Sequence, residues 1–509
     1  MLKKSKELFD FWNCSSLRYC HWKGNEHLVE GLNGDTDLDV LLDPMDKEKG
    51  CSILEEIGFV KFHSQFGSRY PNVEDWIGFD VDTGRLLHLH LHYALQTGHT
   101  GLKEYALPWA DEALETRIQD KKTGIYTMNP HLELVSLYTR LILKAKHKWI
   151  RAAKNCQYKI NNHFQKEIDF IKKRVDWHMV EIIALRYYGS LSGEFVEIVK
   201  SDRLDSQQFL RLYFIVNKTM SNYSRYHGLS LFVLRIFYSA TVFMRKVVRQ
   251  RIGWNLITRK VVNPEAGFTL ALIGQDGCGK STVTTEIEKW LNWKIDARRF
   301  YLGSGDHYNG LLKQLLNKGF EIKYRNKKKD IQKEKKGKRS QTKRKKNLKN
   351  FFPAILVALN MLIIARRAYK TIKKSEVYRK KGGISLFDRY PQLQYEGIYD
   401  GPKIASFYRK TGLDYVVLKW MSKKERSYIE KIQQCQPRLV FKLMLPPEES
   451  IRRKPFEKLE IVTQKHEITQ QLIFDHSIVY DIDATQDYQQ ELIFIKNQIW
   501  KEIQKSHIL

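Results

Sequence analysis

Gly274-Gln275-Asp276-Gly277-Cys278-Gly279-Lys280-Ser281 is the stretch that decides the fold of this 509-residue chain. It satisfies the pattern G-x-x-x-x-G-K-[ST] in full, and it follows the apolar run Phe268–Ile273. In such a loop the glycines let backbone N–H groups converge on phosphates, and the helix that follows adds a favourable field. Lys280 is expected to reach the β/γ-phosphates, and Ser281 to offer its hydroxyl to Mg²⁺. The sequence therefore predicts ATP and Mg²⁺ as cofactors, bound by Gly274, Gln275, Asp276, Gly277, Cys278, Gly279, Lys280, Ser281 and Thr282.

Short apolar runs alternate with helical segments on the carboxy-terminal side of this loop. Such alternation is typical of an α/β fold in which helices flank a parallel sheet. The expected strands are Thr269–Ile273, Arg299–Leu302, Ile384–Phe387, Leu439–Leu445 and Ile478–Ile482.

The length of the chain predicts about three domains. Residues 1–128 mix short apolar runs with turn signals, which favours a small α/β domain. Residues 129–262 have helical spacing and few breakers, so we expect a helical connector. Residues 263–509 then form the phosphate-loop domain.

The formal net charge of +30 is concentrated in one segment. Residues 321–350 contain 15 Lys or Arg against three acids and have almost no apolar residue to bury, so they predict a flexible basic insertion. Its stretch 323–349 offers a surface for nucleic acid or for an anionic membrane. The six scattered cysteines favour a cytoplasmic protein, and a peripheral association with the inner membrane stays open, also through the apolar run Leu231–Met244.

Four stretches of the last 246 residues carry a family resemblance. They are Gly274 to Thr282, Ala365-Arg366-Arg367-Ala368, Gly383 to Tyr390 with its ending Asp388-Arg389-Tyr390, and Leu445 to Lys454. In combination they resemble the thymidylate kinase family of nucleoside-monophosphate kinases over about residues 264–509.

The resemblance implies transfer of the γ-phosphate of ATP to a nucleoside monophosphate or a related small anionic acceptor. Asp388 would hold the metal or take a proton, and Arg452 or Arg453 would close over the phosphoryl group. Asp276, Arg367 and Arg389 would bind the acceptor. The stretch Leu302–His307 replaces the acceptor loop usual in the family, so an acceptor other than dTMP is expected.

A second resemblance lies near the amino terminus. Lys23-Gly24-Asn25, followed by Asp37-Leu38-Asp39-Val40, resembles the signature of the nucleotidyltransferase superfamily. On a strand Asp37 and Asp39 would face the same side and could jointly bind a divalent ion. His90 stands where a third carboxylate is expected, and Asp80 or Asp82 could supply that carboxylate instead.

Several hypotheses remain open at this point. The alternating histidines His88, His90 and His92 could ligate a transition metal, belong to a degenerate transferase that only binds a ligand, or form a half-exposed strand face. The whole chain could be a nucleotidyltransferase acting through Asp37 and Asp39 with the phosphate loop as ATP sensor, or a nucleic-acid-associated NTPase.

The fused arrangement also resembles kinase-like proteins of bacterial surface-polysaccharide gene clusters, which implies a phosphorylated sugar or nucleotide-sugar precursor as the small-molecule acceptor. A homodimer is left open.

Overall fold

The chain folds into two compact units. The computed structural model describes residues 1–65, 69–99, 101–144, 162–201, 204–252, 260–302, 343–398, 400–406, 415–455 and 458–506. The first unit comprises Met1–Pro264 and Trp500–Leu509, and the second comprises Glu265–Ile499. The helices expected to form a connector belong to the first unit, and the division into three domains stays a prediction.

The first unit is built on a mixed eight-stranded sheet with the order β10-β3-β4-β5-β2-β1-β9-β8. β2 pairs with β5 and β1 with β9 in parallel, and the other pairs are antiparallel. A separate hairpin joins β6 (Leu95–Thr97) and β7 (Tyr105–Leu107). The strands of the large sheet are β1 (Tyr19–His21), β2 (Leu38–Leu42), β3 (Val60–Ser64), β4 (Val73–Asp80), β5 (Arg85–His92), β8 (Ile118–Gln119), β9 (Tyr126–Thr127) and β10 (Val261–Val262).

Ten α-helices of the first unit lie within the described residues. They are α1 (Lys3–Cys14), α2 (Leu28–Leu32), α3 (Lys47–Glu56), α4 (Ala110–Glu115), α5 (Pro130–Lys144), α7 (Asn162–Lys172), α8 (Trp177–Tyr188), α9 (Ser192–Lys200), α10 (Ser206–Met220) and α11 (Gly228–Ile252).

Strand alternation separates the two faces of this sheet. Leu87, Leu89 and Leu91 of β5 and Val40 of β2 are fully buried in one cluster with Leu8 and Trp12 of α1. Because side chains alternate along a strand, the three histidines of β5 point to the opposite face.

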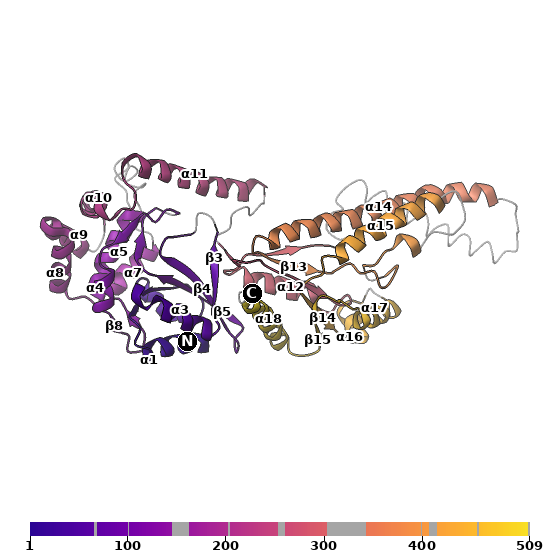
Figure 1. Cartoon of the computed structure of the whole chain (residues 1–509), viewed down its shortest axis with the longest axis horizontal. Helices are drawn as coiled ribbons and strands as arrows, with labels where there is room; N and C mark the ends of the chain where they lie inside the picture. Colours follow the sequence, from indigo (N-terminus) through magenta and orange to yellow (C-terminus); the bar gives the residue numbers. More distant parts are fainter. Residues whose placement is uncertain are drawn as a thin grey trace. The chain divides into compact units, whose positions relative to one another are not determined.

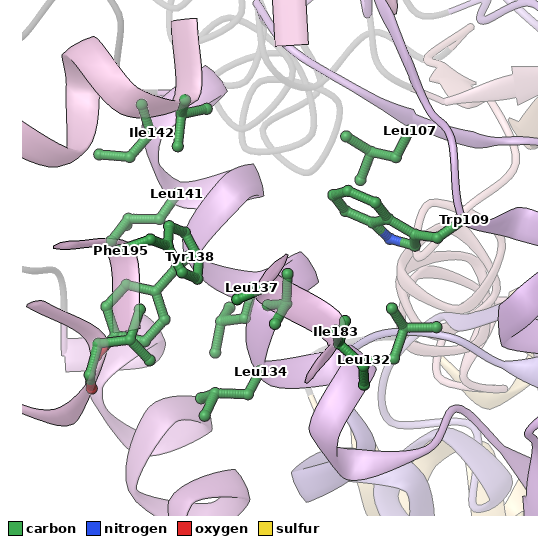
Figure 2. Packing of buried hydrophobic residues seen from close by; sticks show 14 of the residues in the cluster. Leu107, Trp109, Leu132, Leu134, Leu137, Tyr138, Leu141, Ile142, Ile183 and Phe195 are labelled. Carbon is green, nitrogen blue, oxygen red and sulfur yellow. The ribbon is translucent and has the colours of Figure 1, made fainter. Parts of the chain in front are cut away.

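A larger apolar cluster holds the helices of the first unit together (Figure 2). α5 is buried along nearly its whole length and supplies Leu134, Leu137 and Leu141. Ile183 of α8 and Phe195 of α9 pack against it. α5, α7, α8 and α9 thus share one hydrophobic core.

In α11 polar side chains contact the rest of the unit and apolar side chains are exposed, the reverse of a helix that packs on a core. Its polar side chains contact the rest of the unit, because Arg235 donates to Glu104 and Ser239 bonds to His99 at 3.0 Å. Seven of its apolar side chains are at least half exposed, namely Leu229, Phe232, Val233, Ile236, Phe237, Phe243 and Met244. A membrane-surface role for this helix stays a prediction. Among the described residues, no helix combines the length and the apolar character needed to cross a membrane.

The second unit contains a fully parallel five-stranded sheet with the order β12-β13-β11-β14-β15. The strands are β11 (Thr269–Ile273), β12 (Ala297–Phe300), β13 (Ile384–Asp388), β14 (Leu439–Met444) and β15 (Ile478–Asp483). The described helices are α12 (Lys280–Leu291), α14 (Lys343–Arg379), α15 (Tyr415–Gln433), α16 (Pro447–Arg453), α17 (Leu459–Gln471) and α18 (Tyr488–Lys505), whose last residues belong to the first unit.

Helices cover this parallel sheet. α14 and α15 lie side by side (Figure 1), and their Ile372 and Ile432 share a core cluster with Ile273 of β11. The prediction of an α/β fold with a parallel sheet and flanking helices is confirmed. The five expected strands are all present, and β12 starts and ends two residues earlier than expected. Residues 321–342 of the expected insertion lie outside the described residues, and α14 begins at Lys343.

The α5 core provides a stability prediction. Leu137 is fully buried, whereas Leu185 on the neighbouring α8 is 61% exposed. We expect Leu137→Ala to lower the free energy of unfolding by about 2–5 kcal/mol, because it removes buried methyl groups and leaves a cavity. Leu185→Ala, the matched control, should change it by about 0.5 kcal/mol or less. Urea denaturation followed by circular dichroism measures both, and equal effects would contradict the packing described for α5.

Candidate functional site

The phosphate loop connects the carboxyl end of the central strand β11 to the first turn of α12. Gly279 precedes the helix with a φ of 94°, and Gly277 has a φ of 93°. A Cβ atom on Gly277 would lie 2.9 Å from the carbonyl oxygen of Ser450. The positive φ angle therefore favours glycine at both positions, and the close approach of α16 requires it at Gly277 as well.

Lys280 is buried inside this loop. Its ammonium group donates to the carbonyl oxygens of Gly274 at 2.8 Å and Gln275 at 2.7 Å. The positive charge is thus held where the loop N–H groups and the N-terminus of α12 converge, which is the arrangement a polyphosphate chain requires.

Ser281 and Asp388 meet at the edge of the sheet. β11 and β13 pair in parallel with Leu272 opposite Asp388, so the loop after β11 starts beside the end of β13. The hydroxyl of Ser281 donates to Asp388 Oδ2 at 2.8 Å, and Arg299 of β12 donates to the same oxygen at 2.8 Å. A hydroxyl and a carboxylate are hard oxygen donors of the kind Mg²⁺ prefers, so these two residues fit a magnesium ion.

On the other side of the loop, the Asp276 carboxylate pairs with two cationic side chains. Arg389 donates to its Oδ1 at 3.2 Å, and Lys465 of α17 bonds to its Oδ2. Burial acts to raise the pKa of Asp276, but Lys465, with Lys280 and Arg389, lowers it to about 2. Arg389 has a φ of 117°, a strained value for a residue with a side chain, and its guanidinium also lies 3.9 Å from Asp400.

A cleft of about 120 Å³ opens between these residues. Four cations and two carboxylates line it, together with Ile273, Gly274 and Tyr390: the cations are Lys280, Arg389, Lys403 and Lys465, and the carboxylates are Asp276 and Asp400. The excess of cations suits an anionic ligand.

The structure thus brings together Asp276, Lys280, Ser281, Asp388 and Arg389. Gln275 and Cys278 are buried in the loop, and Thr282 is exposed on α12. Arg367 is exposed on α14 and does not line the cleft. Arg452 and Arg453 are also absent from the lining residues, and both pair with Glu449 within α16. The roles assigned to these three arginines stay predictions.

Sequence reasoning missed Lys465, Lys403 and Arg299. Lys465 is 189 residues from its partner Asp276, and no motif surrounds it. Arg299 lies in the run expected as the second strand. Pairing of that strand with the strand of Asp388 would have indicated that Arg299 lies near this carboxylate.

A second cluster of polar residues lies in the first unit. Asp39 of β2 is in register with His90 of β5, which is in register with Asp75 of β4. His90 Nε2 lies 3.1 Å from Asp75 Oδ1, and its Nδ1 lies 3.3 Å from Asp39 Oδ1. Lys23 bonds to the same Asp39 oxygen at 2.8 Å, and His92 Nε2 lies 3.0 Å from it.

Burial and charge shift the pKa values of the two neighbouring histidines His90 and His92 in opposite directions. Burial acts to lower the pKa of His90, but its bonds to Asp39 and Asp75 raise it to about 10. Burial lowers the pKa of His92 to about 4. Burial acts to raise the pKa of Asp75, but His88 and His90 hold it well below its usual range.

A cleft of about 470 Å³ borders this cluster. Its charged lining comprises Lys23, Lys47, Lys61, Arg69, Lys103, Asp39, Glu74 and Asp75. The third carboxylate beside His90 is Asp75, whereas Asp80 accepts from the backbone of Lys4 and from Thr83. Counting back along the strand from the turn at Asp82–Gly84 would have placed Asp75 opposite His90.

Comparison with known proteins relates part of the chain to two Escherichia coli proteins. YghR of strain K12, described as an ATP-binding protein, is 26% identical over 225 residues, which are 44% of this chain and 83% of YghR. YghS of the same strain, also described as ATP-binding, is 24% identical over 229 residues, 44% of this chain and 89% of YghS. No described protein family matches the chain.

Among solved structures, deoxyadenosine kinase from M. mycoides with bound dATP aligns with 46% of this chain and 98% of its own length. The identity is 17% and the TM-score is 0.26. The same kinase with dCMP and dCDP aligns with 45% of this chain at 15% identity and the same TM-score. At this identity and TM-score the similarity says nothing about the chemistry of the site, which follows from the residues of this chain.

The lowered pKa of Asp276 predicts that the free energy of unfolding falls at acid pH. Since the folded state binds this proton less readily than the unfolded state, the carboxylate contributes stability above about pH 4, and the contribution is lost as the pH falls toward 2. We expect Asp276→Asn to lose less free energy of unfolding than the wild type between pH 4 and pH 2, measured by urea denaturation at each pH. Asp475→Asn, at an exposed position, is the control and should follow the wild type. An equal acid loss in Asp276→Asn and wild type would show that the Lys465–Asp276 pair does not form in solution.

Proposed function

We propose that the second unit is an ATP-dependent phosphotransferase acting on a small anionic acceptor. One observation carries the proposal: Lys280 is buried at the start of α12 while Ser281 touches Asp388 at 2.8 Å across the paired strands β11 and β13. This places a lysine, a hydroxyl and a carboxylate around one point, as phosphoryl transfer from a nucleoside triphosphate requires. The ATP-binding descriptions of YghR and YghS support ATP as the donor.

The loop residues would divide the donor between them. The N–H groups after Gly277 and the N-terminus of α12 would hold the phosphates, and Lys280 would exchange its loop carbonyls for phosphate oxygens. Ser281 and Asp388 would hold Mg²⁺, which when bound neutralises charge on the transferring phosphoryl group. Arg299 fixes the Asp388 carboxylate, so that its orientation toward Ser281 is set before the donor arrives.

The cleft beside Asp276 favours a phosphorylated acceptor. Arg389, Lys403 and Lys465 supply three cations there in addition to Lys280. The volume of about 120 Å³ suits a phosphate group and part of the sugar that carries it. A nucleoside monophosphate and a phosphorylated sugar share this group, so the cleft does not select between them.

A phosphorylated acceptor would not need a strong base from the described residues that line this cleft. Asp276, with a pKa of about 2, is a weak base held by two cations. The oxygens of a phosphate monoester are already ionised at neutral pH, so one of them can attack the γ-phosphorus without giving up a proton. The side chains therefore have to position and neutralise the two anions.

Replacement of Lys280 tests the proposal. We expect Lys280→Ala to lower kcat/KM for phosphoryl transfer by about 100-fold or more, because a donor aimed at the developing charge is lost. Labelled ATP with a panel of nucleoside monophosphates and phosphorylated sugars measures the transfer. Lys289→Ala, exposed on the same helix, is the matched control and should retain wild-type activity.

Two outcomes would contradict the proposal. If Lys280→Ala retains the turnover of the wild type, the phosphate loop is not the catalyst. If turnover is lost in Asp37→Ala but persists in Lys280→Ala, the transfer belongs to the first unit, as the nucleotidyltransferase hypothesis predicts.

A further inference from the structure

His88 and His90 of β5 share one strand face and take no part in the proposed phosphoryl transfer. Their ring centroids are 4.4 Å apart. His88 is buried, with 3% of its side chain exposed, while 29% of the His90 side chain is exposed. Two imidazoles so close together on one face of a sheet can share an anionic partner or a metal ion.

One carboxylate oxygen orients both rings. Asp75 Oδ1 lies 3.2 Å from His88 Nε2 and 3.1 Å from His90 Nε2. An ionised carboxylate only accepts hydrogen bonds, so both Nε2 atoms donate. Ser64 donates to the other oxygen of Asp75 at 2.7 Å and fixes the carboxylate itself.

The opposite nitrogen of each ring then faces a further carboxylate. His88 Nδ1 lies 2.8 Å from Asp37 Oδ1, and His90 Nδ1 lies 3.3 Å from Asp39 Oδ1. In its neutral form each imidazole has used its single N–H at Asp75, so its Nδ1 presents a lone pair. His90, whose pKa the two carboxylates raise to about 10, carries a proton on this nitrogen that a metal ion would displace. A lone pair that faces a carboxylate oxygen needs a cation between them, and a metal ion serves as well as a proton.

The spacing suits a metal ion. In a tetrahedral site with metal–ligand distances of about 2.0–2.2 Å, neighbouring donor atoms are about 3.3–3.6 Å apart. The donor atoms of Asp37, His88 and His90 all lie within 4.8 Å of one another. Histidine ligands that give their second N–H to a carboxylate are typical of such sites, because the bond fixes the ring and its tautomer.

We propose that Asp37, His88 and His90 bind one divalent first-row transition metal ion, with Asp75 as a positioning residue for both imidazoles. Two nitrogen donors and one carboxylate select such an ion over Mg²⁺, which prefers oxygen ligands alone. The exposed parts of Asp37 and His90 leave the ion open to solvent or to a ligand.

The neighbouring group Asp39, His90 and His92 satisfies the same distance criterion but is less suitable. Lys23 lies 2.8 Å from Asp39 Oδ1, so an ammonium group already bonds to the carboxylate oxygen that this group would offer to a metal ion. His92 Nδ1 is buried and has no hydrogen-bond partner among the described residues, so no outer carboxylate fixes this ring.

Cobalt(II) titration of the full-length, chelator-stripped protein tests the proposal. The titration is done without nucleotide, because the phosphate loop binds its metal together with phosphates. We expect one Co²⁺ per chain with the visible absorption of a nitrogen and oxygen site, and displacement of Co²⁺ by one equivalent of Zn²⁺. Asp37→Asn and His88→Gln should each weaken binding by at least 10-fold, and His92→Gln, the matched control, should leave the affinity unchanged.

Asp75→Asn distinguishes a positioning residue from a ligand. We expect it to weaken Co²⁺ binding by about 10–100-fold while the absorption bands of the bound ion are retained. Because His88 is buried and its replacement can destabilise the fold, Asp37→Asn on a partly exposed residue carries the decision, with thermal unfolding of the metal-free variant confirming that it is folded.

Three results would overturn the proposal. They are the absence of a stoichiometric ion in the wild type, unchanged affinity in Asp37→Asn, and loss of the ion in His92→Gln with retention in His88→Gln. The first would show that protons alone fill the cluster, and the last would place the ion at Asp39. Activity of the phosphate loop is not needed for any of these readouts, so their failure is distinct from failure of the proposed function.

Discussion

Parallel pairing between β11 and β13 sets Leu272 beside Asp388, and the candidate site of the second unit is built outward from this register. In a parallel sheet all strands end at the same edge, so the loop after β11 and the end of β13 meet there. Ser281 then reaches Asp388, and Arg299 arrives from β12 on the other side of β13. A slip of one residue would turn Asp388 to the opposite face and separate these groups.

The first unit relies on the same kind of constraint with a different result. A tight turn fixes the antiparallel register of β4 and β5, and β2 is joined to β5 in parallel, so Asp39, His90 and Asp75 fall in one row. The alternating leucines of β5 pack against α1 and fix which side the histidines face. The apolar core on one face therefore determines the polar chemistry on the other.

The parts of the site that depend on local order could be predicted from the sequence. The phosphate loop is a continuous motif, and Asp388 is recognisable because an acid follows a buried strand. Asp75 could also have been predicted, since its position opposite His90 follows from the position of one turn. Sequence patterns of this kind fix what happens within one element or across one hairpin.

Contacts between distant segments could not be predicted. Lys465 approaches Asp276 because α17 packs under β14, and nothing near Lys465 in the sequence signals that contact. Residues 129–262 were expected to form a helical connector, and the apolar faces of α5, α7, α8, α9 and α10 within this range are buried in one core of the first unit. A pattern of apolar residues predicts that a helix face is buried, but it does not indicate which segment packs against that face.

The hydrogen bonds of Lys280 with its own loop bear on how a ligand is selected. Two carbonyl groups already hold the ammonium group, so an incoming phosphate has to take their place, and the loss of these two bonds offsets part of what the charged contact contributes. The rest of the selection would come from the curvature of the loop, whose N–H groups would contact several phosphate oxygens at once. A compact anion such as sulfate would meet the same charge but only part of that curved surface, so shape as well as charge would discriminate between ligands at this loop.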